Sequence, residues 1–158
     1  MRLATSKDLD ALVDMQVEFE KYFQNTNCCE KYKINKISRR KDILALNFSK
    51  NHIARTLIAE VNGEIVGRIS FYKGYWAEVP PYWGFRLSGL FVHEKYRKMG
   101  ISKMLFEALT KIAKKEKMKT ISWSVWGQNV PAVRFYENLG GKYYSREHDE
   151  HYMFYDVN

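Results

Sequence analysis

A short basic stretch in the middle of the chain has the composition of an anion-binding loop. It reads Arg97-Lys98-Met99-Gly100-Ile101-Ser102 and lies between a strand-like segment ending at Val92 and a long amphipathic segment. A helix that begins here exposes unpaired N–H groups and the positive end of its dipole, which together attract anions. Gly100 lets the backbone come close to a ligand and adopt positive φ angles. The alternative is an ordinary helix start with solvated lysines, and this loop by itself does not separate the two interpretations.

A second segment carries a phenol in a pattern that predicts a short helix. It reads Asn129-Val130-Pro131-Ala132-Val133-Arg134-Phe135-Tyr136 and continues to Gly140, which suits a left-handed helix C-cap. Tyr136 is the residue of this segment that could donate a proton to a reacting group. Taken alone, it would be interpreted as a packing residue beside Phe135.

Together the two segments resemble the GNAT superfamily of N-acetyltransferases. That family's loop pattern is Arg/Gln-x-x-Gly-x-Gly/Ala, directly after a strand and opening a long helix. The chain matches it at Arg97 and Gly100 and departs from it at Ser102, which stands where Gly or Ala is usual. The segment from Asn129 to Gly140 is similar to the family's later motif, Asn-x-x-Ala-x-x-Phe-Tyr-x-x-x-Gly. The resemblance covers essentially the whole chain and implies the GNAT fold.

The resemblance implies that acetyl-CoA is the co-substrate and that no metal is needed. Backbone groups of Leu90, Phe91 and Val92 would pair with the pantetheine arm like an added strand. CoA carries roughly four negative charges, since a phosphomonoester adds nearly two, and this gives the basic loop a purpose. The remaining predicted cofactor contacts are Arg97, Lys98, Met99, Gly100, Ile101, Ser102 and Lys103 around the pyrophosphate, and Asn129 and Ala132 on the far wall of the cleft.

The resemblance also implies direct attack of an amine on the thioester in a ternary complex, with Tyr136 as the general acid. A strand-end N–H near Val92 would stabilise the oxyanion. The general base stays open, because residues 83–90 contain no carboxylate. Glu78, Glu94 or a chain of water molecules could serve.

The predicted acceptor is a primary amine of a small molecule. The region around Trp126 resembles the diamine and polyamine acetyltransferases, although Ser88 and Gly89 stand where those enzymes place acidic residues. Aromatic residues that could hold an alkylammonium by cation–π contact would form the acceptor pocket; otherwise they belong to the core or to the surface of a homodimer. These are Phe19, Tyr22 and Phe23, the segment 75–83 and the segment 123–128.

Two other functions compete with this one. The net charge of +8 suits an anionic partner, which would be a phosphorylated ligand, an acidic membrane surface or nucleic acid. An N-acetyltransferase acting on a protein amine is the first alternative, and a non-enzymatic module that binds nucleic acid is the second. No RNA-binding aromatic motif or zinc-ligand spacing supports the latter, so nucleic acid is not expected. The lysines between residues 111 and 119 are interpreted mainly as a solvated helix face.

The elements that must position these motifs follow from hydrophobic periodicity. In residues 101–115 the apolar residues recur every three or four positions, which predicts a helix. In residues 55–72 apolar and polar residues alternate with the strand period of two on either side of Asn62-Gly63, which is a strong signal for a hairpin turn. Ser6 and Ser38 are predicted to cap two earlier helices. The predicted order is strand, two helices, three strands, helix, strand, helix and two strands. This is a single α/β domain over residues 1–158, with a mixed, mostly antiparallel sheet of about seven strands and about four helices.

Length and composition agree with one such domain. The 158 residues are 46% hydrophobic, and no run of eighteen apolar residues predicts a membrane span. The start of the chain lacks the apolar block of a signal peptide, so a cytoplasmic location is expected. The adjacent Cys28 and Cys29 suit neither a disulfide nor a metal site. The segment 148–151 is interpreted as a solvated hairpin tip rather than a metal site.

Overall fold

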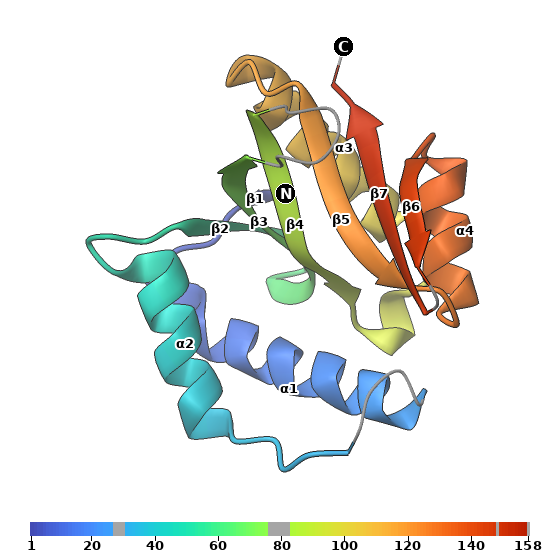
Figure 1. Ribbon diagram of the computed structural model, residues 1–158. Coiled ribbons are helices and arrows are strands. Elements are labelled where there is room, and N and C mark those ends of the chain that lie inside the picture. The colour runs from blue at the N-terminus through green and yellow to red at the C-terminus, as the bar shows by residue number, and fades with distance from the viewer. Residues whose placement is uncertain (27–30, 76–82, 148, 158) are drawn as a thin grey trace.

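The computed structural model describes residues 1–26, 31–75, 83–147 and 149–157. Within these ranges one seven-stranded sheet runs in the order β1-β2-β3-β4-β5-β7-β6, with helices on both faces (Figure 1). The parallel pair is β4 and β5, and the other neighbouring strands of the described sheet are antiparallel. The predicted α/β fold with a mixed, mostly antiparallel sheet is therefore confirmed. In chain order the elements are β1 (Arg2–Leu3), η1 (Ser6–Asp8), α1 (Leu9–Asn25), α2 (Lys36–Phe48), β2 (Ala54–Val61), β3 (Glu64–Tyr75), β4 (Trp83–Val92), η2 (Glu94–Tyr96), α3 (Ile101–Lys115), β5 (Thr120–Trp126), α4 (Val130–Asn138), β6 (Lys142–Glu147) and β7 (Glu150–Asp156).

The β2–β3 hairpin has the turn that its sequence predicts. Asn62 and Gly63 adopt φ angles of 50° and 81°, so both turn residues lie in the left-handed region that a two-residue hairpin requires. The strands on either side are covered on both faces. Consecutive residues Leu57, Ile58 and Ala59 are therefore all buried, although a half-exposed strand would bury only every second one.

Two predicted helix caps are wrong, and in each case a neighbouring residue supplies the cap. In η1, the turn that leads into α1, the Asp8 carboxylate accepts hydrogen bonds from the Thr5 backbone N–H at 2.7 Å and from its hydroxyl at 3.1 Å, so Thr5 rather than Ser6 is the cap residue of this turn. Before α2, the Asn35 side chain accepts from the Ser38 backbone N–H at 3.1 Å. Ser38 thus donates to the cap instead of being it, and the helix begins at Lys36.

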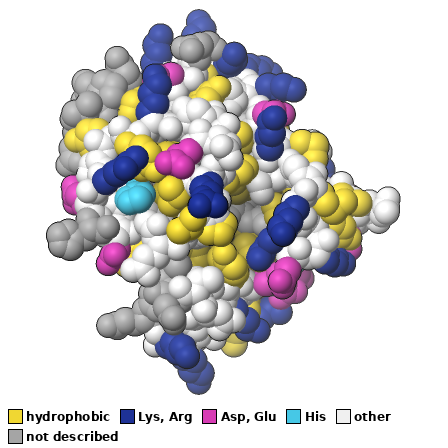
Figure 2. Space-filling view, turned by 90° about the vertical axis from the view of Figure 1, so that its right-hand side faces the viewer, with side chains coloured by type: hydrophobic (Ala, Val, Ile, Leu, Met, Phe, Trp, Pro, Cys, Tyr) yellow, Lys and Arg dark blue, Asp and Glu magenta, His cyan; other side chains and the backbone are white. Residues whose placement is uncertain are grey.

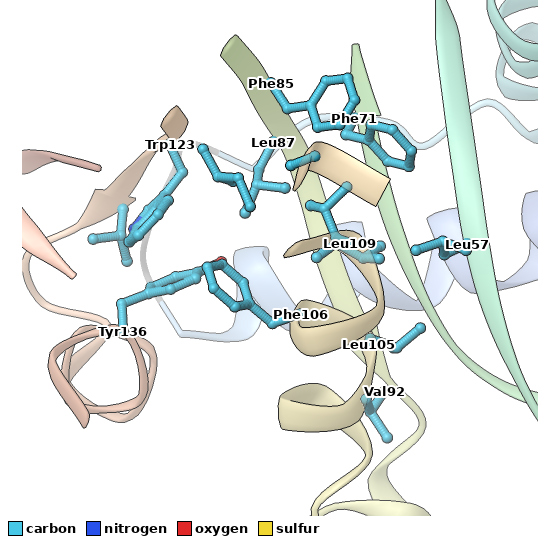
Figure 3. Packing of buried hydrophobic residues seen from close by; sticks show 14 of the residues in the cluster. Leu57, Phe71, Phe85, Leu87, Val92, Leu105, Phe106, Leu109, Trp123 and Tyr136 are labelled. Carbon is cyan, nitrogen blue, oxygen red and sulfur yellow. The ribbon is translucent and has the colours of Figure 1, made fainter. Parts of the chain in front are cut away.

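The main core lies between the sheet and α3. Side chains from β3 and β4, such as Phe71 and Phe85, meet Leu105 and Leu109 of α3, and all four are at most 1% exposed (Figure 3). The other face of β3 is polar, and there Arg68 contacts α1. Helices α1 and α2 cover that second face. None of the described helices combines the length and apolarity needed to cross a lipid bilayer.

Strands β4 and β5 separate after a short paired region, which opens a wedge in the sheet. They are in register only from Gly84 to Arg86, opposite Thr120 to Ser122. Beyond this, β4 bends at a bulge where Ser88 has no register partner on β3, and β5 continues along β7 instead. The divergence of the two strands is visible in Figure 1. Both predicted motifs lie beside this wedge.

Candidate active site

A cleft with two compartments lies at the wedge between β4 and β5. One compartment, of about 480 Å³, is bounded by the loop before α3, and the other, of about 440 Å³, by β5 and β7. Figure 2 views the molecule from the side on which α4 lies in Figure 1, and hydrophobic side chains gather there beside Lys and Arg side chains. Six residues line both compartments, so the two are parts of one cleft. They are Phe19, Phe23, Leu90, Asn129, Ala132 and Tyr136.

The loop before α3 has the backbone of an anion-binding loop. Lys98 and Gly100 adopt φ angles of 63° and 78°, and Gly100 is the N-cap residue of α3. The first helical hydrogen bond runs from the Met104 N–H to the Gly100 carbonyl at 3.0 Å. The N–H groups of Ile101 to Lys103 therefore precede the helical hydrogen bonds, at the positive end of the dipole.

Arg97 fastens this loop to β4 and to α1. Its Nε donates to the Val92 carbonyl at 3.1 Å. Its guanidinium carbon lies 4.8 Å from the ring centre of Tyr22 and 5.5 Å from that of Phe91. The side chain thus orders the loop and brings a positive charge to the wall of the first compartment.

The end of β4 offers backbone groups to the cleft. The His93 N–H donates to the Val66 carbonyl of β3 at 2.9 Å. Because hydrogen-bonding directions alternate along a strand, Phe91 pairs with β3 as well, whereas Leu90 and Val92 direct their N–H and C=O groups away from it. On that side β4 is already separated from β5. Since the Val92 carbonyl accepts from Arg97, the backbone groups of Leu90 and the Val92 N–H form the edge on which an extended ligand can bind.

The other predicted cofactor residues differ in their exposure. Lys98 and Ser102 line the first compartment, whereas Met99 is 61% exposed and lines neither compartment. The Ile101 side chain is buried in the core, and Lys103 points outward on α3. Met99, Ile101 and Lys103 can therefore contact an anion only through their backbone groups or from the edge of the loop.

Asn129 and Ala132 lie on the opposite wall of the cleft. The Asn129 side chain caps α4 by accepting from the Ala132 N–H at 3.4 Å, and Pro131 occupies the first turn of that helix. The cap fixes the start of α4 near Leu90. The residues that follow the end of β5 therefore form the wall of the cleft opposite β4.

The second compartment contains a carboxylate that sequence analysis missed. Glu150 is the one Asp or Glu among the described residues that line it. It lies opposite Trp126 in the β5–β7 register and accepts from the Tyr152 hydroxyl at 3.2 Å. The prediction of a solvated tip at residues 148–151 is therefore wrong for Glu150. No pattern within this segment could have placed the Glu150 side chain beside the cleft, because its position depends on the pairing of β7 with β5.

The aromatic residues predicted for the acceptor pocket are partly brought together. Phe19 and Phe23 line both compartments, Tyr22 lines the first, and Trp126 lines the second. The ring of Trp123 belongs mainly to the core, at 1% exposure. Residues 76–82 of the predicted pocket, including the base candidate Glu78, lie outside the described residues, as do Cys28, Cys29 and His148.

Tyr136 lies where the two compartments meet. Its ring stacks on Trp123 with centroids 4.5 Å apart and an angle of 28°, and both rings extend the core (Figure 3). The residue is 8% exposed, and burial raises the pKa of its phenol above the usual value. The hydroxyl therefore stays protonated at neutral pH. Glu94, the second base candidate, lies in η2 and lines neither compartment.

The described residues contain no group of three or more His, Cys, Asp or Glu side chains placed to hold a metal ion. Separately, the cleft brings together a basic loop at a helix N-terminus, a strand edge, a buried phenol and the carboxylate of Glu150. This combination has the groups that an extended anionic ligand along β4 and a second molecule beside it would need.

The sequence model of the acetyltransferase (GNAT) family matches residues 15–141. The chain belongs to the GNAT acetyltransferase family. The predicted family is thus confirmed, together with its class of enzyme, an acetyl-CoA-dependent N-acetyltransferase.

Individual relatives are more distant. Over 78 residues the chain is 32% identical to L-ornithine N5-acetyltransferase NATA1 of Arabidopsis thaliana, covering 49% of this chain but only 34% of that protein. It is 25% identical over 135 residues to the thialysine N-epsilon-acetyltransferase of Caenorhabditis elegans, covering 85% of this chain and 75% of that protein. The PaiA N-acetyltransferase of Thermoplasma acidophilum, solved in complex with coenzyme A, has a TM-score of 0.75 at 18% identity over 99% of both chains.

Proposed function

We propose that this enzyme transfers the acetyl group of acetyl-CoA to a primary amine of a small molecule, by direct attack in a ternary complex. The neutral amine nitrogen attacks the thioester carbonyl carbon, the C–S bond breaks, and the sulfur leaves as the thiol of CoA. The nitrogen loses one proton and the sulfur gains one. The observation that carries the proposal is the single cleft with an anion-binding compartment and a carboxylate-bearing compartment that meet at Tyr136.

The cofactor would lie in the first compartment. Its pyrophosphate would accept hydrogen bonds from the backbone N–H groups of residues 98–103, and its pantetheine arm would pair with the free edge at Leu90 and Val92. A coenzyme A complex of the structurally similar PaiA protein supports a cofactor site in this fold. The thioester would then lie near Tyr136, whose hydroxyl would donate to the leaving sulfur.

The acceptor would approach through the second compartment. Glu150 would attract its ammonium group, and Phe19, Phe23 and Trp126 would enclose its methylene chain. The names of the Arabidopsis and Caenorhabditis relatives, an ornithine and a thialysine acetyltransferase, support an acceptor with a primary amine at the end of a short chain.

A screen of acceptors tests the proposal. Diamines, polyamines, amino acids with a side-chain amine, and peptides are each incubated with acetyl-CoA, and the released thiol of CoA is measured. We expect turnover with at least one small amine and little with peptides. Turnover with peptides alone would favour the alternative of a protein acceptor, and binding of CoA without turnover on any amine would contradict the proposed reaction.

The anion-binding loop should depend on the left-handed backbone of Gly100. An alanine there would be strained by roughly 1–2 kcal/mol, and relief of this strain would displace the N–H groups that hold the pyrophosphate. We expect Gly100→Ala to raise the dissociation constant of CoA about fivefold. This corresponds to a loss of about 1 kcal/mol of binding free energy, since about 1.4 kcal/mol changes a dissociation constant tenfold. Isothermal titration calorimetry measures the effect.

Gly63 supplies a matched control for this substitution. It has nearly the same φ, 81° against 78°, and an added Cβ meets nothing within 4 Å at either glycine. It lies in the β2–β3 turn and lines neither compartment. Gly63→Ala should cost similar stability and leave CoA binding unchanged. Equal CoA affinity in both variants would show that the loop conformation is unimportant for the cofactor.

A further inference from the structure

Arg68 is a buried cation that lacks a carboxylate of its own. It lies on β3 at 7% exposure; its Nη1 donates to the Ser70 hydroxyl at 3.0 Å and its Nη2 to the Gln16 side-chain oxygen. Its Nε has no hydrogen-bond partner, and no ion pair joins the group to an Asp or Glu in the ranges that the structure describes. Burial lowers the pKa of Arg68 to about 10, so the guanidinium is still charged at neutral pH.

The buried carboxylate that acts electrostatically on Arg68 already has three other partners. Glu20, at 5% exposure, accepts from Arg39 Nε at 2.5 Å, from Gln16 at 2.7 Å and from the Tyr32 hydroxyl at 3.0 Å. It acts on Arg68 only through space. Arg39, which is 30% exposed, also pairs with Asp42 at 3.4 Å, whereas the more deeply buried Arg68 forms no direct ion pair with either described carboxylate. An uncompensated buried charge is costly, and an anionic ligand would offset that cost.

A cavity of about 500 Å³ between α1, α2 and the sheet gives a ligand access to Arg68. Arg68, Gln16 and Ser70 line it. Phe19, Phe23 and Ser88 line this cavity and also the second compartment of the cleft, so the two spaces share one wall. At that wall Gly89 carries no side chain, and a Cβ there would lie only 3.8 Å from Arg68 Nη1.

We propose that Arg68 binds a carboxylate of the acceptor, so that the acceptor is an amino acid with a side-chain amine rather than a simple diamine. This inference rests on the proposed acetyl transfer to a small amine. The planar guanidinium matches a carboxylate, and charge-assisted hydrogen bonds of this kind are stronger than neutral ones. With its carboxylate at Arg68, the acceptor extends past Phe23 and Ser88, and its side-chain amine enters the second compartment toward Tyr136.

The test compares acceptors that differ only in the carboxylate. Ornithine is paired with putrescine and lysine with cadaverine, and kcat/KM is measured at saturating acetyl-CoA by CoA thiol release. We expect the amino acid of each pair to be favoured at least tenfold. Arg68→Gln should lower kcat/KM for ornithine at least fivefold and leave that for putrescine within twofold. Arg68→Lys, which retains the charge, should keep part of the preference.

Arg55→Gln is the control for loss of a partly buried arginine, because Arg55 pairs with Glu116 and lines neither this cavity nor the cleft. It should leave the preference unchanged, and CoA binding shows which variants are folded. Equal use of ornithine and putrescine by the unmodified enzyme, or an equal loss on both in Arg68→Gln, would overturn the role of Arg68. Calorimetric binding of ornithine to the CoA complex is independent of turnover. Binding that requires Arg68, without acetyl transfer, would refute the proposed reaction but support the carboxylate site.

Discussion

Replacing Tyr136 with phenylalanine should lower the turnover number at least tenfold and change the dissociation constant of acetyl-CoA little. The substitution keeps the ring that stacks on Trp123 and removes only the hydroxyl at the junction of the compartments. That hydroxyl is proposed to donate to the sulfur as the C–S bond breaks. Since negative charge on sulfur develops only in the transition state, its loss affects turnover and not cofactor binding. Steady-state kinetics with calorimetric titration of CoA measures both quantities.

The size of the effect follows from what the hydroxyl can supply. A hydrogen bond to a charged group is worth about 1.5–3 kcal/mol, which corresponds to roughly a 10- to 150-fold change in rate. Complete proton transfer from a phenol to a thiolate is uphill by roughly 2 kcal/mol in water, and burial of Tyr136 raises its pKa and makes the step harder. The hydrogen bond, followed by late protonation of the sulfur, is therefore the expected contribution.

The raised pKa also determines the pH dependence. A phenol whose pKa is raised in the folded protein stays protonated beyond the usual value, about 10. Tyr136 should thus cause no loss of activity between about pH 8 and 10, and the ratio of unmodified to variant turnover should be constant there. Tyr143→Phe removes a hydroxyl that donates to Glu137 at 2.7 Å outside the cleft and is the control. If Tyr136→Phe has the same turnover number as Tyr143→Phe, the Tyr136 hydroxyl does not take part in the reaction.

The parts of the site that could be predicted from sequence are those that depend on neighbouring residues. The loop at Gly100 and the capped helix that begins after Asn129 are each built from consecutive residues, so their patterns predict the backbone directly. The hairpin at Asn62 and Gly63 is local in the same way. Ser6 and Ser38 failed as caps because Thr5 and Asn35, which lie within three residues of them, are equally suitable cap residues, and composition does not decide between them.

The parts that could not be predicted depend on strand order. Strand β7 lies between β5 and β6, and only this arrangement brings Glu150 opposite Trp126. Likewise, Arg68 is one of several polar residues in β3, and nothing in the sequence of the strand distinguishes it from the others. It is buried because α1 and α2 cover that face of the sheet. Long-range pairing leaves no pattern within either strand, so the carboxylate and the buried cation emerge only in three dimensions.

Gly84→Ala should be the most destabilising of the proposed glycine substitutions. Gly84 pairs with Thr120 in the short parallel contact between β4 and β5, where an added Cβ would lie 2.5 Å from the Thr120 carbonyl oxygen. Backbone at this position cannot move without separating the strands. Overpacking of this kind costs about 3 kcal/mol, and in a domain of this size that lowers the melting temperature by about 6–12 °C. Thermal denaturation followed by circular dichroism measures the change.

Gly74→Ala is the control that distinguishes this clash from a general effect of alanine in a strand, because Gly74 is the register partner of Gly84 on β3. There an added Cβ would meet only side-chain atoms at 3.6 Å or more, so Gly74→Ala should keep or slightly raise stability. The contact at Gly84 is also where the wedge between β4 and β5 begins. Gly84→Ala should therefore lower kcat/KM for acetyl transfer even at temperatures where the variant is folded. The reason is that the pairing at Gly84 fixes the position of β4 relative to β5, and with it the geometry of the two compartments. A folded Gly84→Ala with unchanged kcat/KM would mean that the site does not depend on how the two strands are joined.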